Sequence, residues 1–171
     1  MLNKLSLRMI NFLAMLSVVG LLAFAIYLQN VKGLIPCPLC MVQRYAFYAM
    51  AILFFIGIFL PSTKWPLRIQ SILLVLCAGV GLVAAGRQIW LIHFASYIPP
   101  CGADFYYMLH NLPFGQFIFE LINGQGDCAK EEWFLFGVGI VTWSTLGLLF
   151  FFILGCLMPW LPKYLPANRV S

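Results

Sequence analysis

Four long apolar runs divide this chain of 171 residues and decide what it can fold into. They cover about 10–28, 41–60, 67–92 and 133–157. Each is long enough to cross about 30 Å of hydrocarbon as a helix that rises about 1.5 Å per residue. Hydrophobic residues make up 63% of the chain and charged residues only 9%, proportions that exclude a water-soluble domain. The sequence therefore predicts an all-α membrane protein, a bundle of four transmembrane helices that forms a single domain over 1–171.

Basic residues predict which way the spans cross the membrane. The N-terminal segment, the link between the second and third runs, and the C-terminal segment together hold six Lys or Arg and no acidic residue. By the positive-inside rule we expect these segments, and so both termini, in the cytoplasm. Two loops, at about 29–40 and 94–132, then face outward, and the longer one holds all five acidic residues. Because the basic residues are scattered between apolar runs, no nucleic-acid partner is expected.

The longer loop contains a second kind of apolar pattern. Between a proline at 113 and a glycine at 124, apolar residues recur at the spacing of one helix face: Phe114, Phe117, Ile118, Leu121 and Ile122. The pattern predicts a short helix. Two placements are open, one on the membrane surface with the apolar face down and one packed on the ends of the four spans. The fold prediction adopts the membrane-surface helix.

Six cysteines fall into two groups by their depth in the membrane. Cys77, in the third run, and Cys156, near the end of the fourth, are predicted to be small apolar fillers. The other four lie on the outward side as two pairs, Cys37 with Cys40 directly before the second run and Cys101 with Cys128 in the longer loop. Two pairs on an oxidising face indicate disulfide chemistry.

The first pair has the spacing of a small reversible disulfide. At a helix N-terminus, the dipole and the free N–H groups would stabilise the thiolate of Cys40. Arg44 follows four residues later on the same helical face, where its charge can stabilise a thiolate or a reduced, anionic cofactor. A cation at the membrane edge is costly, which favours this functional role over an arginine that only snorkels to the headgroups.

The second pair admits two interpretations. A bond between Cys101 and Cys128 would stabilise the loop by about 3–4 kcal/mol on the chain-entropy model, or it would offer an exposed disulfide to the thiolate of another protein. A four-thiolate zinc site is the competing chemistry, but its usual ligand spacing is absent and no metal is predicted. His93, at the outer end of the third run, is predicted to line a pocket with Arg87 and Gln88.

Several short motifs together resemble one known family. They are Pro36-Cys37-Pro38-Leu39-Cys40, Gln43-Arg44, Pro100-Cys101-Gly102 and Gly126-Asp127-Cys128-Ala129, with Trp133 following. The set is similar to the DsbB family of bacterial inner-membrane thiol:quinone oxidoreductases, and the resemblance covers nearly the whole chain, including the four spans and the loop sizes. It implies a multi-pass protein of the inner membrane whose two redox loops lie in the periplasm.

The resemblance also implies an electron relay. A reduced periplasmic DsbA-like protein of thioredoxin fold would attack the Cys101–Cys128 disulfide, with Cys101 as the partner in the mixed disulfide. The electrons would then pass to Cys37 and Cys40. Cys40 is implied to face a bound ubiquinone or menaquinone, with Arg44 beside the quinone oxygen. Gln88 and His93 are predicted as further cofactor-binding residues.

Three alternatives compete with this protein-dithiol:quinone oxidoreductase. They are a vitamin K epoxide reductase-like thiol:quinone enzyme, a non-enzymatic scaffold of four spans with structural disulfides, and a zinc-binding membrane factor. The short chain and the absence of a fused thioredoxin-like domain count against the first. Bound quinone, together with quinone-dependent oxidation of a dithiol protein, is expected only of the relay and not of the scaffold or the zinc factor.

The predicted orientation is testable with reporter fusions. A fusion at Lys64 is expected to report the cytoplasm and a fusion at Gln116 the opposite side, because the basic segments stay inside. Labelling of both sites from the same side of the membrane would contradict the assignment.

Overall fold

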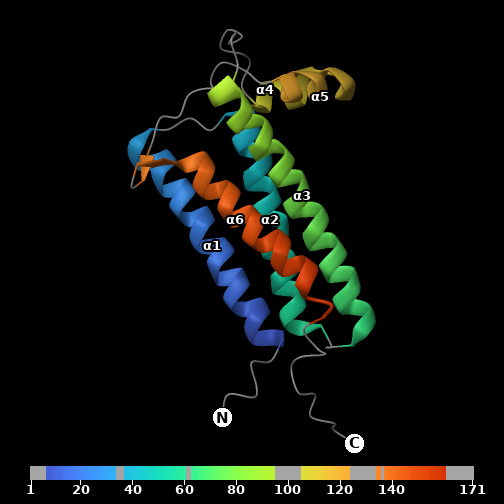
Figure 1. Cartoon of the computed structure of the whole chain (residues 1–171). Coiled ribbons are helices and arrows are strands. Elements are labelled where there is room, and N and C mark those ends of the chain that lie inside the picture. Colours follow the sequence, from blue (N-terminus) through green and yellow to red (C-terminus); the bar gives the residue numbers. More distant parts are fainter. Residues whose placement is uncertain are drawn as a thin grey trace, which may run out of the picture.

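Four long helices build the chain into a bundle in the computed structural model, which describes residues 7–33, 37–60, 63–94, 105–123, 134–135 and 137–160 (Figure 1). The helices are α1 (Leu7–Lys32), α2 (Pro38–Phe59), α3 (Lys64–Phe94) and α6 (Ile140–Leu157). All four are long and apolar enough to cross a membrane. The expected four-helix membrane bundle is confirmed.

Helices that follow one another along the chain pack together, α1 on α2, α2 on α3 and α3 on α6. In Figure 1, α6 crosses α2 from the side of α1 toward the start of α3. Glycine permits this close crossing, because a Cβ at Gly81 would come within 2.7 Å of the Leu148 side chain and one at Gly155 within 3.3 Å of Leu74. The core between these helices is formed by large buried side chains: Met50, Phe54, Leu74, Leu148 and Phe151.

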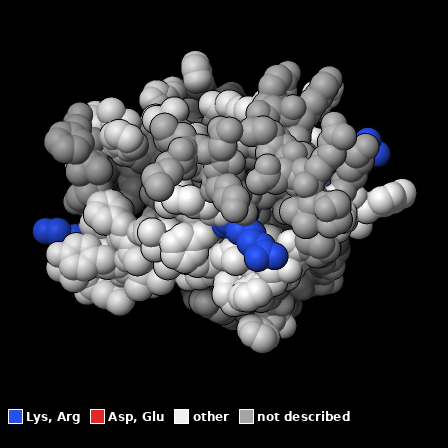
Figure 2. All heavy atoms as spheres, turned by 90° about the horizontal axis from the view of Figure 1, so that it is seen from below, with Lys and Arg blue, Asp and Glu red and all other residues white. Residues whose placement is uncertain are grey.

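The two ends of the bundle differ in chemistry. We call one the cysteine end, where α2 begins after Cys37, and the other the basic end, where α1 and α3 begin with Arg8 and Arg68 close to their starts. Figure 2 looks onto the basic end and shows Lys and Arg side chains there, with no Asp or Glu among the described residues that it displays. Arg8 and Arg68 are two of the six basic residues from which the sequence predicts orientation, and the orientation itself stays a prediction.

Buried amides join three helices toward the basic end. The Gln70 side chain of α3 donates hydrogen bonds to Asn11 Oδ1 of α1 at 2.7 Å and to the Leu53 carbonyl of α2 at 3.2 Å. Asn11 Nδ2 in turn donates to the Gly57 carbonyl at 3.4 Å. Because polar groups in hydrocarbon need partners within the protein, these bonds fix the register of α1, α2 and α3.

The predicted fourth span, 133–157, is too long at its start. Its described residues before Ile140 include two short strands, β1 (Phe134–Leu135) and β2 (Val138–Gly139), which pair antiparallel with Phe134 opposite Gly139. Gly137 between them has a φ of 77°. A residue in this left-handed conformation cannot continue a right-handed helix, so α6 starts only after the turn. The other three helices extend beyond the predicted spans of 10–28, 41–60 and 67–92 by two to four residues, except at the end of α2, which stops one residue earlier than predicted.

Two short helices lie at the cysteine end, α4 (Phe105–Asn111) and α5 (Phe114–Asn123) (Figure 1). The sequence predicts α5 and not α4. Phe117 and Leu121 of α5 pack on the ends of α2 and α3, while Phe114 is 80% exposed. The helix therefore contacts the span ends through part of its apolar face, and its contact with the membrane surface stays a prediction.

Candidate redox site at the cysteine end

The Cys-Pro-Leu-Cys motif forms the start of α2. Cys37 is the N-cap, Pro38 occupies the first turn, and the backbone N–H of Cys40 donates to Cys37 Sγ at 3.3 Å. Proline suits this position because it has no N–H to satisfy. The two sulfurs lie 2.8 Å apart, with Cys37 buried and Cys40 half-buried. The sequence assigned the stabilisation by the helix terminus to Cys40, whereas the structure gives this backbone hydrogen bond to Cys37, which occupies the capping position.

Gln88 of α3 lies against both sulfurs. Its Nε2 is 3.1 Å from Cys40 Sγ and 3.4 Å from Cys37 Sγ, and the side chain is 2% exposed. Gln43 of α2 donates to Gln88 Oε1 at 2.8 Å, and the Ser144 hydroxyl of α6 donates to Gln43 Oε1 at 2.6 Å. A chain of hydrogen bonds thus crosses from α6 through α2 to α3 and ends at the cysteine pair.

Arg44 is directed toward α1. Its Nη1 donates to Gln29 Oε1 at 2.5 Å and its Nη2 to the Ala25 carbonyl at 3.3 Å, and the side chain is half-buried. These bonds hold the guanidinium in the bundle and connect α2 to α1. Its role beside a quinone oxygen stays a prediction.

The other two residues predicted to share a pocket with Gln88 point elsewhere. His93 is exposed, with its Nδ1 3.1 Å from the Ile89 carbonyl of its own helix, and Arg87 stacks over the Trp90 ring at 4.5 Å. Of the three, Gln88 is the residue whose side chain the structure brings to the sulfurs.

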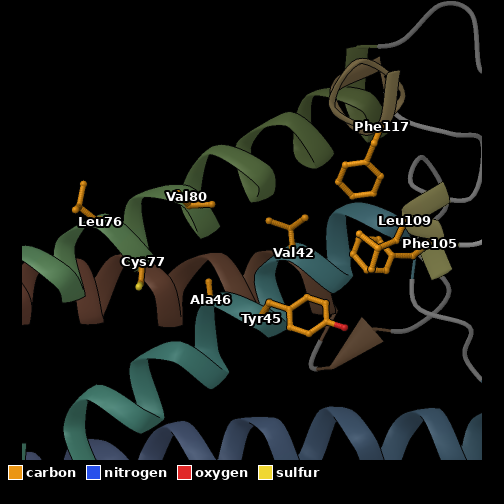
Figure 3. Close-up of a pocket in the computed structure, with 9 residues that line it drawn as sticks. All are labelled: Val42, Tyr45, Ala46, Leu76, Cys77, Val80, Phe105, Leu109 and Phe117. Atoms are coloured by element: carbon orange, nitrogen blue, oxygen red, sulfur yellow. The ribbon is translucent and has the colours of Figure 1, made fainter. Parts of the chain in front are cut away.

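An apolar groove of about 500 Å³ lies between α2 and α3, with α4 and α5 at its outer end (Figure 3). Its described lining is Val42, Tyr45, Ala46, Leu76, Cys77, Val80, Phe105, Leu109 and Phe117. Val42 also packs against the cluster of apolar side chains around Cys37, so the groove adjoins the cysteine pair. Leu76 and Val80 are each 59% exposed, which leaves the groove open to the outer surface of the bundle. Neither Gln88, Arg87 nor His93 is among these lining residues.

The two cysteines predicted as fillers differ from each other. Cys77 is half-buried and lines the groove at the end away from α5 (Figure 3). Cys156 is exposed, so its description as a buried filler is wrong. It follows Gly155, which faces α3, and the next position on a helix is rotated by about 100° toward the bundle surface.

Comparison with known proteins identifies the family. Residues 7–158 match the family model described as "Disulfide bond formation protein DsbB". Curated relatives named Disulfide bond formation protein B include that of Marinobacter nauticus, 36% identical over 162 residues that cover 94% of this chain and 96% of the relative. That of Polaromonas naphthalenivorans is 42% identical over 137 residues, 80% of this chain and 81% of the relative. The chain belongs to the DsbB family. No solved structure matches it.

The match to the DsbB family contains all four cysteines of the predicted relay, since it runs over residues 7–158. Two of them, Cys37 and Cys40, form the site described above. The other two, Cys101 and Cys128, lie outside the residues that the structure describes, as does Trp133. Their pairing stays a prediction.

Sequence reasoning missed Ser144 and Val42 and gave no role to Gln43. The available signal for Ser144 was a hydroxyl within an otherwise apolar span, which calls for a partner in the protein. Gln43 carried the same signal on α2. Which polar residues meet, however, depends on how the helices are rotated about their axes, and one sequence does not define that.

Proposed function

We propose that this chain is a protein-dithiol:quinone oxidoreductase of the bacterial inner membrane. It reoxidises a periplasmic DsbA-like dithiol protein and passes two electrons to ubiquinone or menaquinone, which supports disulfide bond formation in exported proteins. The observation that carries the proposal is a pair of cysteines with adjacent sulfurs, Cys37 and Cys40, at the end of a membrane bundle and beside an apolar groove. Membership of the DsbB family supports this function over the scaffold, zinc and vitamin K epoxide reductase-like alternatives.

The surroundings of the pair favour an acceptor that dissolves in lipid. Cys37 is 5% exposed and sits among Leu39, Ala84 and Leu91. The groove next to this cluster is lined by aliphatic and aromatic side chains, and its volume is within the range of small-molecule sites, about 300–1,000 Å³. These residues fit the apolar body of a quinone. A bound quinone supplies an acceptor for the two electrons and two protons that the pair releases when its disulfide closes.

The remaining chemistry is thiol–disulfide exchange within the protein. A thiolate of the reduced partner attacks Cys101, forms a mixed disulfide and releases Cys128 as a thiol. The second thiol of the partner then resolves the mixed disulfide, so the partner leaves oxidised and both loop cysteines are reduced. Attack by a loop thiolate on a Cys37–Cys40 disulfide returns the loop pair to its oxidised form and leaves Cys37 and Cys40 as thiols.

The chain's own residues prepare the thiols for this exchange. The backbone N–H of Cys40 holds the Cys37 sulfur, and the Gln88 amide contacts both sulfurs. We propose Arg44 as the cation that stabilises negative charge near the acceptor, and His93 as a more distant member of the site.

Removing cysteines one at a time separates the two halves of the relay. Cys101→Ala or Cys128→Ala is expected to block electron entry from the partner and to leave Cys37 and Cys40 oxidisable by quinone. Cys37→Ala or Cys40→Ala is expected to block oxidation by quinone altogether. Quinone absorbance and the redox state of each pair measure the two steps in purified protein.

Cys156→Ala is the matched control and is expected to cost little activity, since Cys156 is exposed on α6 and is not among the groove's lining residues. Loss of turnover in Cys156→Ala with an intact fold would show that the thiols cannot be sorted by their place in the bundle. Quinone reduction that survives in Cys40→Ala would contradict the proposed function.

Filling the groove tests where the acceptor binds. Val80→Trp places a large ring in the groove from its exposed side and is expected to raise the apparent KM for quinone at least several-fold. Val83→Trp is the matched control, since Val83 is 76% exposed on the same helix and does not line the groove. Steady-state kinetics against quinone concentration compare the two variants. Equal kinetics would place the acceptor elsewhere.

Replacing Arg44 tests its role as an electrostatic group. Loss of one preorganised donor in a water-poor site costs about 3–4 kcal/mol of transition-state stabilisation. Arg44→Met is therefore expected to slow quinone reduction by on the order of a hundredfold or to raise the apparent KM. Arg44→Lys should restore only part, because it keeps the charge without the planar fork. Exchange between the loop pair and the partner is expected to stay nearly unchanged.

Gln29→Leu is the control for this variant, because it removes a hydrogen-bond partner of Arg44 on α1 and keeps the cation. Wild-type kinetics in Arg44→Met, or an equal loss in Gln29→Leu, would mean that the arginine serves helix packing alone.

A further inference from the structure

The two sulfurs of the cysteine pair share the Gln88 amide as a donor, and Cys37 has a backbone donor as well. Cys37 Sγ accepts the backbone N–H of Cys40, a donor that the start of α2 always provides. Cys40 Sγ is the nearer of the two sulfurs to Gln88 Nε2, at 3.1 Å against 3.4 Å. Cys40 Sγ also lies 2.8 Å from Cys37 Sγ and 3.5 Å from Gln88 Oε1, and the donor that reaches it from another helix is the Gln88 amide.

The Gln88 amide is oriented by its neighbours. Gln43 Nε2 donates to Gln88 Oε1, which turns the Gln88 NH₂ group toward the sulfurs. The Ser144 hydroxyl donates to Gln43 Oε1, which in turn fixes the Gln43 amide. Each member thus donates to the next in the order Ser144, Gln43, Gln88 and sulfur. Gln43 and Gln88 are both buried, so water does not compete for these bonds.

A chain of donors that ends on sulfur suits a thiolate better than a thiol. A thiolate is an anion and only accepts hydrogen bonds, and bonds to ionised groups are about twice as strong as those between neutral groups. We propose that Gln88 stabilises the Cys40 thiolate, and that Gln43 and Ser144 are positioning residues that hold the Gln88 amide in its donating orientation. The inference rests on the proposed function in taking the Cys40 thiolate as the form that reacts.

Charged and titratable side chains near this end have contacts of their own. On α2 and α3, Arg44 bonds to α1, Arg87 stacks over Trp90, and His93 is exposed. The remaining described groups at this end are exposed: Tyr27 and Lys32 toward the end of α1, Tyr107 and His110 on α4, Glu120 on α5, and Tyr45, which lines the groove. The part of α6 that faces the pair contributes the neutral Ser144.

Removal of the Gln88 amide is predicted to change two quantities, the stability of the Cys40 thiolate and the redox equilibrium of the pair. Without the amide donor the thiolate loses stabilisation, so the reduced pair becomes less stable and its reduction potential falls. Gln88→Leu is expected to lower the equilibrium constant for reduction of the pair by about tenfold, which is about 30 mV for two electrons. It is also expected to slow the alkylation of Cys40 at pH 7 by about tenfold.

The experiment uses full-length protein, purified without quinone, in which the other four cysteines are alanine. Equilibration with a dithiothreitol buffer gives the redox equilibrium, and mass spectrometry of the alkylated peptide gives the rate at Cys40 as a function of pH. Ser144→Ala leaves Gln88 in place and is expected to shift both values in the same direction by about two- to threefold. Gln88→Glu places an anion beside the sulfurs and is expected to shift both by more than Gln88→Leu.

Thr145→Val is the matched control. The Thr145 hydroxyl bonds to the Val141 carbonyl at 2.8 Å, the same acceptor that Ser144 also contacts, whereas the hydroxyl that bonds to Gln43 is that of Ser144. It is expected to leave both values unchanged. Equal values in wild type and Gln88→Leu, or an equal shift in Thr145→Val and Ser144→Ala, would overturn the inference.

If Gln88→Leu fails to fold, Ser144→Ala tests the inference alone, since this variant removes only one hydroxyl. Neither the redox equilibrium nor the alkylation rate requires quinone or a partner protein, so the outcome of the experiment is independent of the proposed function. Shifts as expected in a protein that does not reduce quinone would refute the function and leave the inference standing.

Discussion

Every polar group buried in this bundle needs a partner within the protein, because the surrounding lipid offers none. Among the described residues, no buried side-chain nitrogen or oxygen lacks a hydrogen bond. Two polar layers meet this requirement, Asn11 with Gln70 toward the basic end and Gln88 with Gln43 and Ser144 at the cysteine end. The first layer connects three helices and has no reactive group. The second has the same physical basis but ends on two sulfurs.

This constraint also explains why the redox pair sits where α2 begins. The first turn of a helix has free backbone N–H groups, and at the edge of a membrane they cannot rely on lipid to satisfy them. Pro38 removes one of these donors and Cys37 Sγ accepts another. Capping the helix and holding a reactive sulfur are therefore the same interaction. Cys40, one turn inside, receives the Gln88 amide from α3.

Hydrophobic patterning was sufficient to predict the four spans and the helix α5, and the spacing of Cys37 and Cys40 was sufficient to predict that they lie together. These features depend on composition and periodicity, which can be read along the chain. The predicted start of α6 was wrong. The apolar run contains no charge or proline that would mark where the helix begins, and the left-handed Gly137 near the start of the run delays the helix. Arg44 was predicted beside Cys40 from its spacing, yet its hydrogen bonds go to Gln29 and Ala25. A long side chain on a helix can reach either neighbouring helix, and only the packing of α1 against α2 selects one.

Arg44 and the groove lie on different sides of α2. The guanidinium bonds to α1, whereas the groove is bounded by α2, α3, α4 and α5. Cys40 lies in the first turn of the same helix, and its sulfur is in contact with Gln88 of α3. An acceptor that enters by the groove meets the boundary of α2 and α3, and the amide from α3 is the polar side chain that contacts both sulfurs. The roles proposed for Arg44 and Gln88 therefore invoke different physical terms for the same thiolate. Support from Arg44 would be long-range and set by charge, at a distance that the packing of α1 imposes, whereas the hydrogen bond from Gln88 is short-range and sensitive to geometry.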